Sequence, residues 1–224
     1  RELRGRLRGE RAPLLAGFKI THRCNLRCAS CPFWRRPGDD ISWERALQTL
    51  EALHAAGVRF LIFEGGEPLI WRDGERRLED LVREARRRFF AVGVTTNGTL
   101  PLVTEADVLW VSIDGLREAH DRNRGPIFDR VIENIRASAH PRLLANVTIN
   151  RLNVAEMPAL VRFLSDIEQI EGITIQFFYP YDESEDLAVT PAQRIEVLEQ
   201  LIALKRQGYP LLDSTPALRS LERN

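Results

Sequence analysis

Cysteine is scarce in this chain of 224 residues: three are present, and none follows Cys31. A chain of this length can bury roughly 70% of its unfolded surface without disulfides, so the cysteines need another explanation. The sequence also lacks any run of about 18 apolar residues, which excludes a membrane-spanning helix. The Arg-rich start has no apolar stretch after its charges, which excludes a secretory signal peptide. We therefore expect a cytoplasmic protein.

An excess of charge of either sign is missing as well. Lys and Arg together number 32, as do Asp and Glu, so the net charge is zero. This balance argues against binding to nucleic acid or to a membrane surface through bulk electrostatics, and it favours a small or neutral partner. With 44% hydrophobic and 29% charged residues, the composition is that of one globular domain. We expect an Arg-rich N-terminal extension over residues 1–14, a core domain over 15–208, and over 209–224 the start of a C-terminal extension that is truncated at Asn224.

Short β-rich segments alternate with helical segments along most of the chain. The six expected strands are Leu15–His22, Arg59–Phe63, Ala91–Thr95, Val108–Ile113, Leu143–Asn150 and Ile173–Tyr179. The expected helices are Ser42–Ala56, Gly74–Phe89, Ile127–Ala139, Val154–Ile170, Pro191–Gln207 and a last segment, Thr215–Arg223. Apolar strands that alternate with helices predict a parallel sheet, as a doubly wound sheet or a full or partial α/β barrel. In each of these folds the reactive groups lie on loops at the carboxyl ends of the strands.

All three cysteines lie in one loop after the first expected strand, where Cys24, Cys28 and Cys31 form a C-x3-C-x2-C pattern. Three thiols this close cannot all pair as disulfides, and in a cytosolic protein such a cluster indicates metal ligation by zinc or iron–sulfur. Three cysteines on a 4Fe–4S cluster leave one iron open, as an active site needs. Two alternatives stay open: a structural zinc site with His22 as the fourth ligand, and a thioredoxin-like redox pair of Cys28 and Cys31.

Further motifs follow the next three expected strands. They are Gly65-Gly66-Glu67-Pro68, Thr95-Thr96-Asn97-Gly98 and Ser112-Ile113-Asp114-Gly115. Together with the cysteine loop, and over nearly the whole chain, they resemble the radical S-adenosylmethionine (radical SAM) enzymes. The last two motifs are similar to the branch with peptide-modifying and molybdenum-cofactor-biosynthesis-like members. The resemblance implies a 4Fe–4S cluster held by the three cysteines, with S-adenosylmethionine chelating the open iron. An open-sided barrel suits this chemistry, so we expect an α/β fold with a partial (β/α)6 barrel of parallel strands.

The resemblance also implies which residues bind S-adenosylmethionine. The loop from Gly65 to Pro68 holds the methionyl amine, and its glycines suit a close approach of the backbone to the ligand. Ser112 corresponds to the ribose contact and Arg124 to the carboxylate contact. The predicted cofactor-binding residues are Gly65, Gly66, Glu67, Pro68, Thr95, Asn97, Ser112 and Arg124. The alternatives are plain turns for the glycine and asparagine loops and a solvated side chain for Arg124.

One position departs from the pattern of the family. Many relatives carry an aromatic residue directly before the last cysteine, where it packs on adenine, and this chain has Ser30 there. Phe33 and Trp34 follow the motif directly and are the candidates to stack on the cofactor or to shield the cluster.

The function implied by the resemblance is enzymatic. It is the reductive cleavage of S-adenosylmethionine at a 4Fe–4S cluster to a 5′-deoxyadenosyl radical, which abstracts a hydrogen atom from an unidentified substrate. The implied partners are a small-molecule or peptide substrate and a one-electron donor such as a flavodoxin or a ferredoxin. The acidic segment Tyr179–Asp186 is a candidate contact for a cationic or peptide substrate, with a solvated loop as the alternative.

Overall fold

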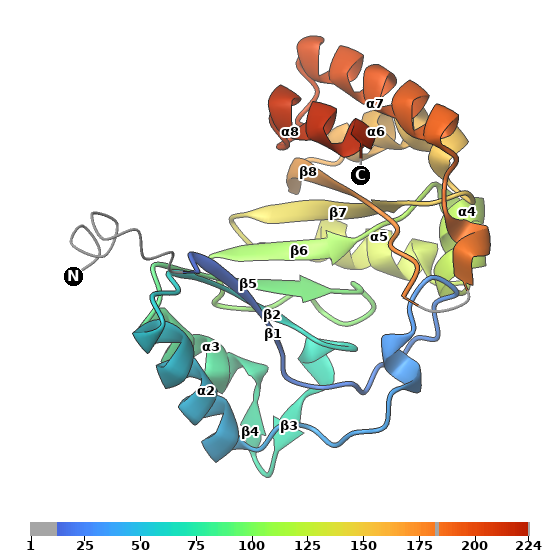
Figure 1. The fold of residues 1–224 in the computed structure, drawn as a ribbon. Coiled ribbons are helices and arrows are strands. Elements are labelled where there is room, and N and C mark those ends of the chain that lie inside the picture. Colours follow the sequence, from blue (N-terminus) through green and yellow to red (C-terminus); the bar gives the residue numbers. More distant parts are fainter. Residues whose placement is uncertain (1–12, 182–183, 224) are drawn as a thin grey trace, which may run out of the picture. The chain divides into compact units, whose positions relative to one another are not determined.

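The computed structural model describes residues 13–181 and 184–223 and contains a parallel sheet of six strands in the order β1-β2-β5-β6-β7-β8 (Figure 1). The strands are β1 (Leu15–Lys19), β2 (Phe60–Glu64), β5 (Ala91–Thr96), β6 (Val108–Ser112), β7 (Leu143–Ile149) and β8 (Ile170–Phe177). The chain divides into two compact units. The first comprises the described residues of 1–25, 36–96 and 104–109, and the second comprises 26–35, 97–103 and 110–223. The α/β class and the parallel strands are as the sequence predicts.

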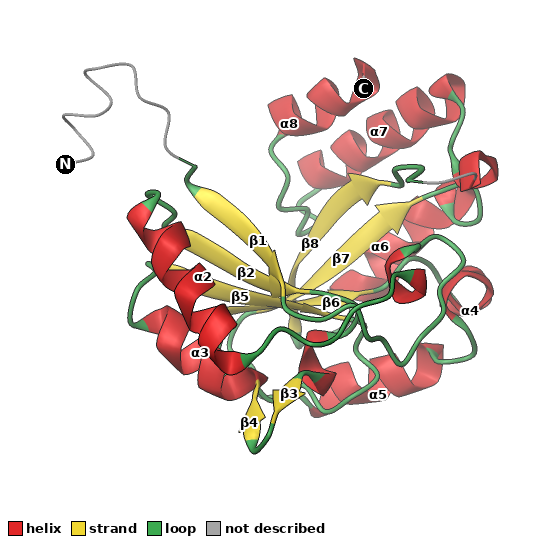
Figure 2. Ribbon diagram, turned by 60° about the horizontal axis from the view of Figure 1, so that its bottom comes forward, coloured by secondary structure: helices red, strands yellow, loops and turns green. Residues whose placement is uncertain are grey.

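The first unit is a three-stranded parallel segment covered by two helices. Leu15 pairs with Phe60 between β1 and β2, and Phe60 pairs with Ala91 between β2 and β5. The helices α2 (Trp43–Ala55) and α3 (Leu78–Arg86) lie along the same face of these strands (Figures 1 and 2). Ser42 caps α2, since its side chain accepts from the amide of Arg45. The buried side chains that join these helices to the strands include Leu50, Leu61, Phe63, Leu81, Val82 and Val92.

The prediction of a helix over Gly74–Phe89 is wrong in its first part. Two short antiparallel strands, β3 (Arg72–Asp73) and β4 (Arg76–Arg77), form a hairpin there, and α3 begins only at Leu78. Gly74 has a φ of 54°, a left-handed conformation that makes the hairpin turn instead of a helical turn.

The first strand is also shorter than predicted, since it ends at Lys19 and not at His22. The backbone carbonyls of Thr21 and Arg23 accept hydrogen bonds from Gly66 and Glu67. Thr21 and Arg23 therefore bond to the loop after β2 and do not continue the hydrogen-bond ladder of β1. Of the predicted N-terminal extension, residues 1–12 lie outside the described residues.

The second unit is built on β7 and β8 with a set of helices. These are α4 (Arg117–Arg124), α5 (Phe128–Ala137), α6 (Met157–Ser165), α7 (Pro191–Arg206) and α8 (Thr215–Ser220). Thr190 caps α7 in a reciprocal pair with Gln193, and the helix starts with Pro191, a residue that suits the first helical position. The sheet continues beyond β8, because Ile173 donates its amide to Pro210 and accepts from Leu212. Residues 210–212 thus add a short parallel segment to the edge.

Two helix predictions in this unit need correction. The helix predicted over Val154–Ile170 is a 3-10 turn, Val154–Glu156, followed by α6, which ends at Ser165. Residues from Ile170 onward belong to β8, so Gly172 lies inside the strand and does not end the helix. The helix α4 has no counterpart in the prediction, since its sequence, REAHDRNR, carries no apolar stripe.

Within the described residues, no helix combines the length and the hydrophobicity that a bilayer crossing requires.

Candidate active site

The residues that the sequence singles out lie at or after the carboxyl ends of the parallel strands, and the structure divides them between the two units. Cys24, Gly65, Gly66, Glu67, Pro68 and Thr95 belong to the first unit, and Cys28, Cys31, Asn97, Ser112 and Arg124 belong to the second. No cysteine of the described residues is in a disulfide.

In the first unit, the two glycines lie directly against the segment that leads into Cys24. The amide of Gly66 donates to the carbonyl of Thr21 at 2.8 Å, and the amide of Glu67 donates to that of Arg23 at 2.9 Å. A Cβ atom on Gly66 would lie 2.1 Å from the carbonyl oxygen of Arg23, and one on Gly65 would lie 2.5 Å from that of Thr21. Glycine is required here because two backbones pack together; the approach of this loop to a ligand stays a prediction.

Glu67 is 0% exposed and closes the same loop from inside. Its Oε1 accepts from the amide of Leu69 at 3.0 Å and from the hydroxyl of Thr96 at 2.8 Å. The carboxylate caps the turn Pro68–Ile70 and joins the end of β2 to the end of β5. Sequence reasoning singles out Thr95, which is half-buried, and misses Thr96, whose side chain points to the opposite face of the strand.

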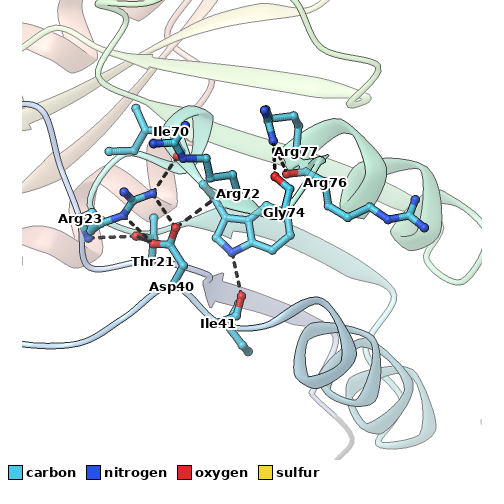
Figure 3. Close-up of polar contacts among 10 residues, drawn as sticks. Thr21, Arg23, Asp40, Ile41, Ile70, Arg72, Gly74, Arg76 and Arg77 are labelled. Carbon is cyan, nitrogen blue, oxygen red and sulfur yellow. Dashed lines mark hydrogen bonds and ion pairs between the residues drawn. The ribbon is translucent and has the colours of Figure 1, made fainter.

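Asp40 ties the start of the cysteine loop to its return (Figure 3). The hydroxyl of Thr21 donates to Asp40 at 2.5 Å, and the guanidinium of Arg23 donates to both carboxylate oxygens, at 2.9 and 2.6 Å. Arg23 also donates to the carbonyl of Ile70 at 3.1 Å. Burial raises the pKa of Asp40, but the bonds from Arg23 and Thr21 outweigh it and hold this pKa below its ordinary value. The backbone just before Cys24 is thereby held from both sides, and sequence reasoning misses Asp40 because its partners lie far along the chain.

In the second unit, the turn between the last two cysteines is held by a helix. Cys28 is buried, Cys31 is half-buried, and the amide of Cys31 donates to the carbonyl of Cys28 at 3.3 Å. The two amides between them both donate to Asn123 of α4: Ala29 to its backbone oxygen at 2.7 Å and Ser30 to its Oδ1 at 3.1 Å.

Arg124 is not solvated but is bound to a buried carboxylate. Its side chain is 14% exposed, and its Nε donates to Oδ2 of Asp114, which is 1% exposed, at 2.6 Å. Burial lowers the pKa of Arg124, but Asp114 and the sulfur atoms of Cys28 and Cys31 raise it, and the net shift is upward. Within the described residues, no acceptor is bonded to the two terminal nitrogens of this guanidinium. Arg124 is therefore a permanent cation with two donors available to an anionic ligand.

The other predicted cofactor residues of this unit are buried and partly used in turns. Asn97 accepts from both the amide and the hydroxyl of Thr99, at 3.0 and 2.7 Å, which is an Asx turn. Ser112 is 8% exposed and ends β6. Asn153, which lies shortly after β7, donates to the carbonyl of Asp114 and accepts from the amide of Asn150.

The aromatic candidates beside the cysteines make contacts inside the second unit. The indole of Trp34 donates to the carbonyl of Cys28 at 3.3 Å, and the guanidinium of Arg35 lies 4.9 Å from its ring centre. Phe33 meets Tyr181 edge to face, with ring centres 5.3 Å apart. Tyr181, near the start of the acidic segment, thus contacts Phe33, the second residue after Cys31. Residues 182–183 lie outside the described residues.

His120 is a buried, neutral histidine that contacts the backbone of Asp114. It is 0% exposed, and its Nδ1 accepts from the amide of Asp114 at 3.3 Å, which leaves the proton on Nε2. Burial first, and then the charge of Arg124, lower its pKa to about 4. Its Nε2 has no hydrogen-bond partner within the described residues.

The stability of the protein should consequently fall in mild acid. The folded pKa of His120 is about 4, whereas an unfolded histidine titrates at about 6.5. The contribution of His120 is therefore complete above about pH 6.5 and is lost as the pH falls toward 4, by about 2 kcal/mol at pH 5. Urea unfolding of the wild type and of His120→Asn, which keeps an acceptor for Asp114, should differ in their pH dependence by this amount between about pH 7.5 and about pH 5. Parallel curves for the two proteins would contradict the buried neutral state.

Comparison with known proteins assigns the family. Residues 18–164 match the family model described as the radical SAM superfamily. The chain belongs to the radical SAM superfamily. The matched residues contain the cysteine loop, the Gly65–Pro68 loop, Ser112 and Arg124, so the structural-zinc alternative with His22 is not favoured.

Three relatives illustrate the range of this superfamily. The chain is 28% identical over 218 residues to the Fe-coproporphyrin III synthase of Methanosarcina barkeri, covering 86% of this chain and 53% of that one. It is 29% identical over 178 residues to a probable GTP 3′,8-cyclase of Methanopyrus kandleri, covering 73% and 55%. The crystal structure of Streptococcus suis SuiB bound to precursor peptide SuiA matches with a TM-score of 0.75 at 15% identity, covering 93% and 50%.

These matches confirm the predicted superfamily and the fold class, a partial barrel of parallel strands. The chain spans about half the length of the relatives it matches.

The family implies a 4Fe–4S cluster and S-adenosylmethionine, and SuiB has also been solved with S-adenosylmethionine bound. By their chemistry the residues present fit both groups. The cysteine loop carries three thiols and no fourth, which is the donor set of a cluster with an open iron; within the described residues, no three Cys, His, Asp or Glu side chains are gathered as a metal site. Arg124, whose pKa the sulfur atoms of Cys28 and Cys31 help to raise, has donors available for a carboxylate.

Proposed function

We propose that this chain is the core of an enzyme that cleaves S-adenosylmethionine reductively and uses the resulting 5′-deoxyadenosyl radical to take a hydrogen atom from its substrate. The observation that carries the proposal is the cysteine loop itself, whose start is packed on the Gly65–Pro68 loop and whose exit is held by α4 beside Arg124. When bound, the 4Fe–4S cluster would supply the electron that breaks the carbon–sulfur bond. Residues 15–208 are proposed as the core domain, with extensions on either side.

The protein's own residues would bind and orient the cofactor. Cys24, Cys28 and Cys31 are proposed to hold the cluster. The terminal nitrogens of Arg124 are proposed to bind the methionyl carboxylate, because they are the unbonded donors of an arginine already oriented through Nε. Carbonyls of the Gly65–Pro68 loop are proposed to accept from the methionyl amine; the buried carboxylate of Glu67 acts from inside by fixing the loop.

The remaining contacts follow the strand ends. The hydroxyl of Ser112 is proposed to bind the ribose, and Thr95 and Asn97 are proposed to line the sugar or the methionyl end. Asn97 suits this place because the Asx turn with Thr99 holds its side chain in one orientation directly after β5.

The substrate is proposed to be a small molecule or a peptide, and the electron donor a flavodoxin or a ferredoxin. The names of the relatives cover an iron-porphyrin synthase, a GTP cyclase and a protein bound to a precursor peptide, so they support the reaction class and not one substrate. Because a reduced cluster on thiolates needs a reducing compartment, we propose a cytoplasmic setting.

The test is an anaerobic reconstitution of the chain with iron and sulfide. After reduction with dithionite, we expect a 4Fe–4S electron paramagnetic resonance signal that shifts when S-adenosylmethionine is added, with formation of 5′-deoxyadenosine. Absence of a cluster, with about one zinc ion bound per chain instead, would overturn the proposal.

A further inference from the structure

The carboxylate of Asp114 joins the end of β6 to the loop that carries Cys28 and Cys31. Its Oδ2 accepts from Nδ2 of Asn123 and from Nε of Arg124, both at 2.6 Å, and its Oδ1 accepts from the amide of Thr148 at 3.1 Å. With an exposed fraction of 1%, this carboxylate exchanges none of these partners for water. The guanidinium of Arg124 balances the charge of this carboxylate, and the three donors together hold the carboxylate in one orientation.

Asn123 transmits this placement to the cysteine loop. Its side-chain Nδ2 faces Asp114, while its Oδ1 accepts from the amide of Ser30 and its backbone oxygen accepts from the amide of Ala29. An ionised carboxylate only accepts hydrogen bonds, so Asp114 permits a single orientation of the Asn123 amide group. The reversed amide would set an oxygen against the carboxylate and an NH2 against the Ser30 amide.

We propose that Asp114 is a positioning residue for the cysteine loop: by orienting the side chain of Asn123, it fixes the amide of Ser30 and thereby the spacing of Cys28 and Cys31. The inference rests on the proposed function only for what the two cysteines bind. This arrangement of Asp114, Asn123 and the Ser30 amide, called the clamp below, is a property of the chain alone and can be measured without a cluster.

The clamp also has a consequence for a bound cluster. Amides that follow a cysteine are the usual donors to cluster sulfur, and here Asn123 takes two of them. Releasing them, or removing the negative charge of Asp114, favours the more negative, reduced state of the cluster. Both changes act in the same direction, toward a more positive midpoint potential.

The first experiment measures amide hydrogen exchange in the protein without iron. In Asn123→Ala, which removes Oδ1 and keeps the backbone oxygen, the amide of Ser30 should exchange at least about tenfold faster than in the wild type, whereas the amide of Ala29 keeps its acceptor. Asp114→Asn should also accelerate the Ser30 amide, and the amides of β8, which make no bond to Asp114, should keep their wild-type protection. The matched control is Asn134→Ala, which removes a similar bond from α5 to the carbonyl of Gly98 and should leave both amides unchanged.

The second experiment measures the midpoint potential of the reconstituted protein by electron paramagnetic resonance. Asn123→Ala and Asp114→Asn should both shift the potential upward, and Asp129→Asn, which breaks an exposed ion pair with Arg117, should not.

Wild-type exchange at Ser30 in Asn123→Ala would overturn the clamp, whether or not a cluster forms. A protein that forms no cluster would instead overturn the proposed function, and the exchange measurement would still decide the clamp. If Asp114→Asn does not fold, Asn123→Asp replaces it: this variant keeps an acceptor for Ser30 but sets a carboxylate against Asp114, and it should accelerate exchange as the alanine does.

Discussion

Replacing Cys28 with alanine should reduce 5′-deoxyadenosine formation to the background of the assay. The chain has three cysteines, so no other thiol is available to take the place of Cys28 as a ligand. Cys28 is also buried, and it accepts hydrogen bonds from Cys31 and from the Trp34 indole through its carbonyl, so the loop presents its side chain in a defined way. A cluster with two protein ligands in place of three should not assemble stably.

The measurement is iron content together with anaerobic product formation, both relative to the wild type. His22→Ala is the informative companion, because the zinc alternative requires His22 and the iron–sulfur assignment does not. We expect His22→Ala to keep its iron. A Cys28→Ala protein that still forms 5′-deoxyadenosine at the wild-type rate would remove Cys28 from the site.

The second large effect is expected at Gly66, where alanine should lower the free energy of unfolding by about 3 kcal/mol. The new Cβ would lie 2.1 Å from the carbonyl oxygen of Arg23 and 2.7 Å from that of His22. Both obstacles are backbone atoms, so the strain cannot be relieved by a side-chain rotation. The loop must move away from the segment before Cys24, and the bonds from Gly66 to Thr21 and from Glu67 to Arg23 are then lost.

Gly74 supplies the matched control for this substitution. It has a φ of 54°, but a Cβ added there would meet no heavy atom of the described residues within 4 Å. Gly74→Ala should therefore cost only the backbone strain of about 1 kcal/mol. Urea unfolding curves of the two variants measure the difference. Equal losses in both would show that the packing of the Gly65–Pro68 loop against Thr21–Arg23 is not as tight as the structure describes.

Much of the order of strands and helices can be predicted from local patterns. The end of β5 is predicted to within one residue and the start of α7 at Pro191 is predicted correctly, because an apolar run and a helix start with proline are each visible in consecutive residues. The hairpin around Gly74 and the helix α4 are missed. In both, the local sequence is polar and carries no apolar period.

The residues of the candidate site also divide into those that the sequence predicts and those that it misses. Its reactive groups are found from spacing and resemblance, since three cysteines in eight residues and a Gly-Gly-Glu-Pro loop are visible in the sequence alone. The residues that hold these reactive groups in place are not predicted from the sequence. The supporting residues look like ordinary polar residues in the sequence, and each has a partner 17 to 93 positions away: Asp40, Thr96, Asp114 and Asn123.

Residues close together in the chain are enough to establish the order of the elements, the family motifs and the place of each motif at the end of a strand. Which carboxylate meets which donor depends instead on the folded chain: the half-buried Asp40 meets Arg23, the buried Glu67 meets Thr96, and the buried Asp114 meets Asn123 and Arg124. The physical reason is that a buried polar group must find a partner, and the fold determines which distant residue comes within hydrogen-bond distance.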